Sequence, residues 1–124
     1  MRETVAERKR LAAGANGEML LLDAVAKMKE PARGMATRIH KIVKANAPEL
    51  MAKTWYGMPA WAKGDKVVLF FQDAAKFKYR YSTLGFQDAA AIDDGNMWPT
   101  AYALTDIGPA EEAKIVALVK KAVR

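Results

Sequence analysis

The chain has 124 residues, a length that suits one domain with a hydrophobic core of its own. It contains no cysteine, which excludes disulfides, thiolate metal sites and cysteine nucleophiles within this sequence. The net charge of +6 is divided into +5 over residues 1–46, +3 over residues 47–85 and −2 over residues 86–124, and such a basic body attracts anionic ligands.

The longest apolar runs have five residues, far fewer than the roughly 20 that a membrane-spanning helix needs. The N-terminal residues carry charges and lack the apolar segment of a secretory signal peptide. We therefore expect a cytoplasmic protein that does not enter a membrane.

Two glycines interrupt the N-terminal region. Residues 3–13 predict a short charged helix, which Gly14 and Gly17 are expected to break. Asn16 is a favourable N-cap for a second helix over residues 17–29, because its side-chain oxygen accepts a free backbone N–H. The predicted buried stripe of that helix is Leu21, Leu22, Val25 and Met28. We expect residues 1–16 to form an N-terminal extension with a short helix, and residues 17–124 to form a single domain.

Two further helices are predicted from their boundary residues. Pro31 suits the first position of one helix, which Pro48 stops. Pro109 opens the last helix, where Glu111 and Glu112 complement the positive end of the helix dipole. The predicted buried residues are Met35, Ile39, Ile42 and Val43 in the first of these helices, and Ile115, Leu118, Val119 and Ala122 in the second.

A β-hairpin is predicted at Gly64 and Asp65, because glycine supplies the positive φ of a type II′ turn. This turn sets a register in which the facing pairs are Trp61–Val68, Ala60–Leu69, Pro59–Phe70 and Met58–Phe71. The strand over residues 66–71 is apolar on both faces, so both faces of the sheet need cover. We expect helices on one face, and the terminal segments, a ligand or a second subunit on the other.

Residues 76–82 alternate in a pattern that predicts the next strand. One face would carry Phe77, Tyr79 and Tyr81, and the other would carry Lys76, Lys78, Arg80 and Ser82. The connection over residues 72–75 leaves two alternatives open, because a one-residue slip reverses every side chain. A three-residue loop joins the aromatic side chains to Met58, Ala60, Leu69 and Phe71, and a four-residue loop joins them to Trp61, Val68 and Phe70.

A last strand is predicted over residues 97–104, and Pro99 restricts it to a sheet edge. The elements together predict an α+β fold, in which helices pack mainly on one face of an antiparallel sheet to form a two-layer sandwich.

The residues show no recognisable catalytic constellation. His40 is the sole histidine and is interpreted as a surface or flanking residue of its helix, and Ser82 is the sole serine. Neither a nucleophile elbow nor a glycine-rich phosphate loop is present. We therefore expect a protein that is not an enzyme.

Carboxylates are the remaining candidates for metal ligands. Asp88, Asp93 and Asp94 cluster in one loop region, and carboxylate oxygens suit hard cations such as iron or magnesium. The alternative is that these aspartates only form turns.

Nucleic-acid binding is disfavoured by the predicted strand over residues 76–82. Lys76, Lys78 and Arg80 could contact phosphates, but readers of single strands need aromatic side chains on the same surface. The alternation points the aromatic residues of this strand the opposite way, unless Trp61 and Phe70 supply the platform.

The segment Tyr56-Gly57-Met58-Pro59 has unusual local chemistry. Gly57 permits close backbone approach, and Pro59 fixes its own φ and extends the preceding residue. With Trp55, this rigid segment could line a pocket, or it could be a structural bend.

These residues also carry a family resemblance. Trp-Tyr-Gly-Met-Pro-Ala at residues 55–60, Lys-Val-Val-Leu-Phe-Phe at 66–71 and Lys-Phe-Lys-Tyr-Arg-Tyr at 76–81 resemble the YdhG-like family of bacterial domains of unknown function. The match runs from about residue 18 to the C-terminus. The resemblance implies a compact α+β fold with helices on an antiparallel sheet, and it carries over the signature positions Tyr56, Gly57, Met58 and Pro59.

Some members of that family are described as frataxin-like intracellular iron chaperones. The resemblance thus implies an iron-binding role, for which Asp88, Asp93 and Asp94 are the candidate ligands that the sequence itself offers. We expect a non-enzymatic protein that binds iron weakly and has no tightly bound cofactor. The alternative is a small-ligand or protein-interaction module with an aromatic, lysine-rimmed sheet face. Its predicted ligand-binding residues are Trp55, Tyr56, Gly57, Met58, Pro59, Trp61 and Phe70. An uncovered sheet face also predicts a homodimer.

Overall fold

A computed structural model describes the backbone of residues 5–124 and the side chains of Val5 and residues 14–124. The helices are α1 (Val5–Ala26), α2 (Ala32–Asn46), α3 (Ala74–Phe77) and α4 (Pro109–Ala122). The strands are β1 (Met51–Trp55), β2 (Met58–Lys63), β3 (Lys66–Gln72), β4 (Ser82–Phe86) and β5 (Ala101–Leu104). The strands form one antiparallel sheet in the order β1-β2-β3-β4-β5, which confirms the predicted α+β class.

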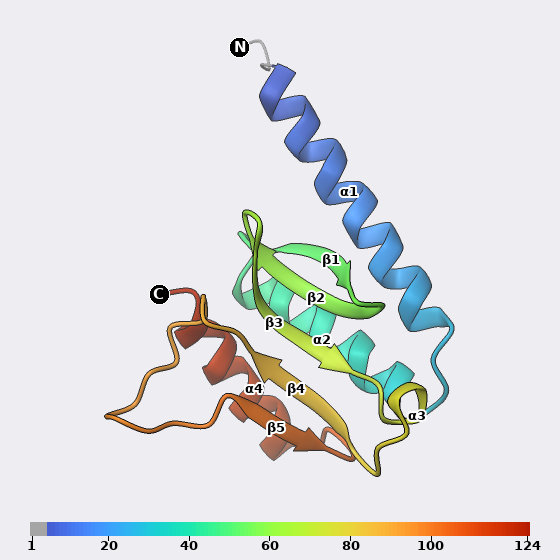
Figure 1. The fold of residues 1–124 in the computed structure, drawn as a ribbon, viewed down its shortest axis with the longest axis vertical. Helices are drawn as coiled ribbons and strands as arrows, with labels where there is room; N and C mark the ends of the chain where they lie inside the picture. Colours follow the sequence, from blue (N-terminus) through green and yellow to red (C-terminus); the bar gives the residue numbers. More distant parts are fainter. Residues whose placement is uncertain (1–4) are drawn as a thin grey trace.

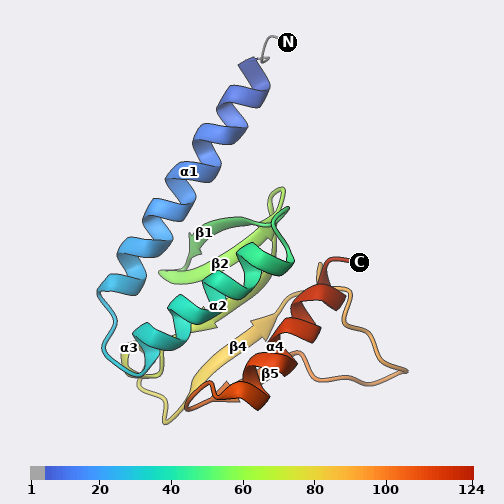
Figure 2. The same cartoon turned by 180° about the vertical axis from the view of Figure 1, so that it is seen from behind.

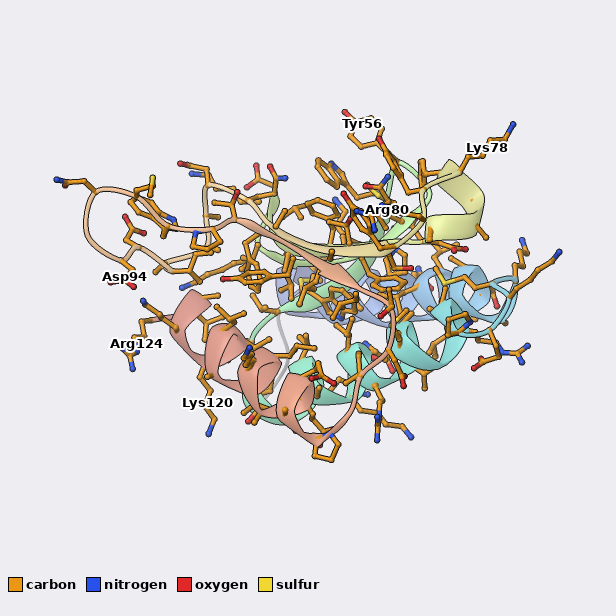
Figure 3. The ribbon with its side chains drawn as sticks, turned by 90° about the horizontal axis from the view of Figure 1, so that it is seen from below. Tyr56, Lys78, Arg80, Asp94, Lys120 and Arg124 are labelled. Carbon is orange, nitrogen blue, oxygen red and sulfur yellow. The ribbon has the colours of Figure 1, made fainter. Side chains whose placement is uncertain are left out.

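The sheet separates two different surfaces. Helices α2 and α4 lie side by side on one face, as Figures 1 and 2 show from opposite sides. Helix α1 runs along the β1 side of the sheet, and its N-terminal end extends beyond the strands. We call the face opposite α2 and α4 the open face; it is uppermost in Figure 3.

The core lies between the sheet and helices α2 and α4. Cross-strand partners share a face, and the pairs Trp61–Leu69 and Phe71–Leu84 both point into this core. The predicted stripes of α2 and α4 are buried there, apart from Leu118, which is partly buried. The core also includes Leu21 and Val25 of α1. In this way all three long helices are held by apolar burial.

The β2–β3 hairpin confirms the predicted turn but not the predicted register. Lys63 pairs with Lys66, and Gly64 has a φ of +63°. The register then shifts between Trp61 and Ala62, so that Trp61 pairs with Leu69 instead of Val68. An extra residue on one strand produces such a β-bulge. As a consequence, Trp61 faces the core whereas Phe70, which pairs with Ala60, lies on the open face.

The predicted strand over residues 76–82 is wrong, and so are both of its predicted loop lengths. Asp73 accepts a hydrogen bond from the Ala75 backbone N–H at 2.9 Å and thereby starts α3. Lys78 ends this helix in the left-handed conformation, with a φ of +60°. The next strand begins only at Ser82. The alternation of side chains in residues 76–81 therefore does not assign them to opposite faces of a sheet.

The predicted break in the N-terminal helix is also wrong. Helix α1 continues through Gly14 and Gly17, and the predicted boundary at residues 16–17 falls inside it. A Cβ atom on Gly17 would lie 2.2 Å from the Ala52 carbonyl oxygen, so the glycine allows α1 to pack against the backbone of β1. Leu22, predicted to be buried, is 46% exposed.

Two strand predictions also change. Strand β1 is absent from the prediction, and the strand predicted over residues 97–104 is shortened to β5. Strand β5 does lie at the sheet edge, as predicted, and Pro99 precedes it.

We predict that Gly17→Ala destabilises the protein by about 1–3 kcal/mol, because the new methyl group must displace the backbone of β1. The matched control is Gly14→Ala, whose Cβ would lie 3.4 Å from the Met51 Cε, an ordinary contact. That variant should gain up to ~1 kcal/mol from helix propensity. Urea unfolding of both variants checks the prediction, and an equal response at the two positions would contradict it.

Candidate functional site

The turn between β1 and β2 holds a tyrosine in a conformation that tyrosine rarely adopts. Trp55 pairs with Met58, which leaves Tyr56 and Gly57 as a two-residue turn with φ values of +51° and +75°. Positive φ at both positions defines a type I′ turn, which favours Asn-Gly. The ring of Tyr56 does not pack in the core, since the residue is 80% exposed to solvent.

Three aromatic rings meet at this turn on the open face. The ring centroids of Trp55 and Tyr56 are 5.0 Å apart, and those of Trp55 and Phe70 are 5.4 Å apart. A Cβ atom on Gly85 would lie 2.2 Å from the Phe70 Cζ, so the Phe70 ring lies directly against that glycine. We call Trp55, Tyr56 and Phe70 the aromatic platform.

Several basic side chains lie on the same side of the sheet as the aromatic platform. Lys76 donates a hydrogen bond from Nζ to the Gly57 carbonyl oxygen at 3.0 Å, which joins α3 to the β1–β2 turn. Lys53 lies two residues before Trp55 on β1 and so shares the open face with it. Figure 3 shows Lys78 and Arg80 on the same side of the sheet as Tyr56. The open face therefore carries both basic and aromatic side chains.

A groove of about 620 Å³ opens beside the turn, between α1 and α3. Gly57 and Lys76 line it and thus connect it to the aromatic platform. Its other charged residues are Asp23, Lys27, Lys29 and Asp73. Because the Asp73 carboxylate is buried and caps α3, the accessible charge of the groove is mainly positive.

The structure divides the predicted ligand-binding residues between two faces. Trp55, Tyr56, Gly57 and Phe70 come together at the open face, and Met58 lies buried on the same face. Pro59 and Trp61 point to the opposite face and are buried in the interior. The predicted aromatic surface around Trp61 and Phe70 is therefore wrong, because the bulge separates these two side chains.

The interpretation of His40 as a surface residue is also wrong, since it is only 6% exposed. The Trp61 indole N–H donates to Nδ1 of His40 at 3.1 Å. An indole nitrogen can only donate, so Nδ1 must carry no proton and the neutral ring is protonated on Nε2. Nε2 lies 3.7 Å from Oε1 of Glu18, which itself accepts a hydrogen bond from Lys44 at 3.0 Å.

Burial lowers the pKa of His40, and Lys44 acts in the same direction, whereas Glu18 opposes both. The hydrogen bond from Lys44 is the main cause of a lowered pKa for Glu18. Sequence reasoning missed this cluster. The available signal was that His40 lies three residues before Val43 and four after Ala36, next to the buried stripe of α2.

The predicted metal residues lie on the connection between β4 and β5. Asp88, Asp93 and Asp94 are all exposed. Within the part of the chain that the structure describes, no three or more histidine, aspartate or glutamate residues come close enough together to hold a metal ion. Iron binding through these aspartates stays a prediction.

Comparison of the chain with protein families, with curated proteins and with solved structures finds no match. None of the helices that the structure describes is long and apolar enough to cross a lipid bilayer.

We predict that the stability of the protein falls as the pH drops below about 6.5, the ordinary pKa of histidine. The unfolded chain takes up a proton there, whereas the folded state, in which the pKa of His40 is lowered, resists protonation until a lower pH. The slope should approach ~1.4 kcal/mol per pH unit. Urea unfolding between about pH 5 and pH 7.5 measures it.

The control for this experiment is His40→Gln, which offers Trp61 an acceptor and does not titrate in this range. Its stability should change less with pH than that of the parent protein. Identical pH profiles for the two proteins would show that His40 is not the responsible group.

Proposed function

We propose that this protein is a non-catalytic, cytoplasmic binding module that holds an aromatic anion on its open face. The observation that carries the proposal is Tyr56, whose left-handed backbone costs of order 1–3 kcal/mol while its ring stays 80% exposed. An asparagine would form this turn at lower cost. The exposed ring is therefore better explained by a contact with a ligand than by the needs of the fold.

The charge of the open face supports an anionic ligand. The five strands contain no aspartate or glutamate, whereas Lys53 and the exposed Lys76 and Lys78 lie on the same side of the sheet as the aromatic platform. Aromatic rings beside ammonium groups suit a planar anion, which gains stacking and ion pairing together.

A non-catalytic role agrees with the structural contacts of the sole histidine and the sole serine. His40 is engaged with Trp61, and the hydroxyl of Ser82 is buried and accepts a hydrogen bond from the Ala74 backbone N–H at 3.1 Å. Both side chains therefore take part in holding the fold.

We predict that Tyr56→Asn weakens binding of 8-anilinonaphthalene-1-sulfonate, an aromatic anion, by roughly fivefold because one ring of the platform is lost. The same change should raise stability by ~1 kcal/mol, since Asn-Gly suits a type I′ turn. Dye fluorescence and urea unfolding measure the two effects. Met97→Asn, which removes an 89% exposed apolar side chain from the β4–β5 connection, serves as control and should change neither.

A second copy of the chain is a competing occupant of the open face, and the predicted homodimer stays a prediction. Light scattering at the protein concentration of the titration distinguishes the two cases. If the protein is a dimer that the Tyr56→Asn substitution dissociates, then dimerisation and not ligand binding explains the exposed ring of Tyr56.

Iron handling, the function that the family resemblance implies, is tested by anaerobic titration with ferrous iron followed by calorimetry. Saturable binding that disappears in the Asp93→Ala/Asp94→Ala variant would support it. Among the described residues, the observations favour binding of an aromatic anion over iron handling. Absence of iron binding in the titration would overturn the iron proposal.

A further inference from the structure

We propose that the ligand of the open face is a single-stranded nucleic acid, with bases stacked on the aromatic platform and phosphates held by the surrounding lysines. This inference rests on the proposed function and names its ligand class. Three properties of the face support this ligand: the absence of acidic residues from its strands, a series of aromatic rings that begins at the exposed Tyr56 and continues to the half-buried Trp55 and Phe70, and the position of its basic side chains.

The first property is the absence of negative charge. No aspartate or glutamate occurs in the five strands, and none occurs in residues 74–86, which include Lys76, Lys78 and Arg80. The nearest acid before that segment is Asp73, whose carboxylate is buried and caps α3. Because a polyanion is repelled by carboxylates, this face is compatible with a chain of phosphates.

The second property is a set of aromatic rings on which nucleic-acid bases can stack. Trp55, Tyr56 and Phe70 form a continuous series with centroid separations of 5.0 and 5.4 Å, and none of the three belongs to the hydrophobic core. Bases of single strands stack on such rings with little sequence preference, because every base has a π-face. A duplex keeps those faces inside its own stack and cannot use the platform.

The third property is a path for the phosphates. The groove between α1 and α3 begins at Gly57, beside the aromatic platform, and its lining contains Lys27, Lys29 and Lys76 together with one exposed carboxylate, Asp23. Lys78 and Arg80 project on the same side of the molecule as Tyr56 (Figure 3). A single-stranded nucleic acid whose bases lie on the aromatic platform would therefore meet lysines both in the groove beside α1 and at α3.

A strand at residues 76–82 would have placed their basic and aromatic residues on opposite faces, which disfavours nucleic-acid binding. That strand does not form. Arg80 lies over the ring of Tyr81, 5.1 Å from its centroid, and Lys76 lies over that of Phe77 at 5.7 Å. The predicted separation of the basic from the aromatic side chains of this segment is therefore absent.

The experiment is a fluorescence anisotropy titration of a labelled thymidine oligonucleotide of about 12 nucleotides with the full chain. Saturable binding is expected. With about three phosphate contacts, raising the salt from about 50 to 200 mM should weaken binding about 20-fold. A duplex of the same length should bind more weakly than the single strand.

Two pairs of variants locate the binding site. Tyr56→Asn should weaken oligonucleotide binding about tenfold through the lost stacking, and Met97→Asn should not. Lys78→Gln should reduce the salt slope by about 0.7, whereas Lys120→Gln, on α4 at the helix side in Figure 3, should leave it unchanged. Both lysine variants change the net charge equally, so general attraction cancels in this comparison.

The outcomes separate this inference from the proposed function. Dye binding that depends on Tyr56 without saturable oligonucleotide binding would overturn the nucleic-acid ligand and leave the aromatic-anion module in place. Equal effects of Lys78→Gln and Lys120→Gln, or duplex binding as tight as single-strand binding, would also overturn it. If the parent protein binds neither the dye nor the oligonucleotide, both proposals are overturned.

Discussion

The β-bulge between Trp61 and Ala62 decides which face of the sheet each aromatic residue occupies. With a regular ladder, Trp61 would face Val68 and share the surface of Phe70. The additional residue turns Trp61 into the core with Leu69 and leaves Phe70 beside Trp55 on the opposite side. The core gains its largest side chain, and the open face keeps the rings that form the aromatic platform.

Burial of Trp61 creates a requirement for a hydrogen-bond acceptor, because an unpaired indole N–H in the interior is costly. His40 meets it with Nδ1 and is thereby kept neutral. Glu18, held by Lys44, lies 3.7 Å from the other ring nitrogen of His40, so this cluster brings β2 together with α1 and α2. The sole histidine of the chain is therefore part of the architecture, although its chemistry resembles that of a functional residue.

Helices α2 and α4 and the turn at Gly64 were predictable because their signals are local: apolar periodicity, flanking prolines and a glycine with positive φ. The failures have tertiary causes. Alternation over residues 76–81 indicated a strand, but the Asp73 cap starts a helical turn there. Gly17 lies inside α1 at the point where β1 packs closely against the helix, and this tertiary contact cannot be seen in the sequence. Trp55, Tyr56 and Phe70 were predicted as ligand-binding residues together with Trp61, and the sequence carries no recognisable signal of the bulge that places Trp61 on the other face.

The strands occupy the sheet in the same order as in the sequence, which has a consequence for how the chain folds. Each strand pairs with its neighbour along the chain, and two of the four connections are two-residue turns. Closing such short loops costs little chain entropy, so the sheet can grow one hairpin at a time. The connection over residues 87–100 is the longest and brings in β5 and then α4. Assembly of this protein is thus mostly a local search, with its slowest closure expected at the C-terminal side.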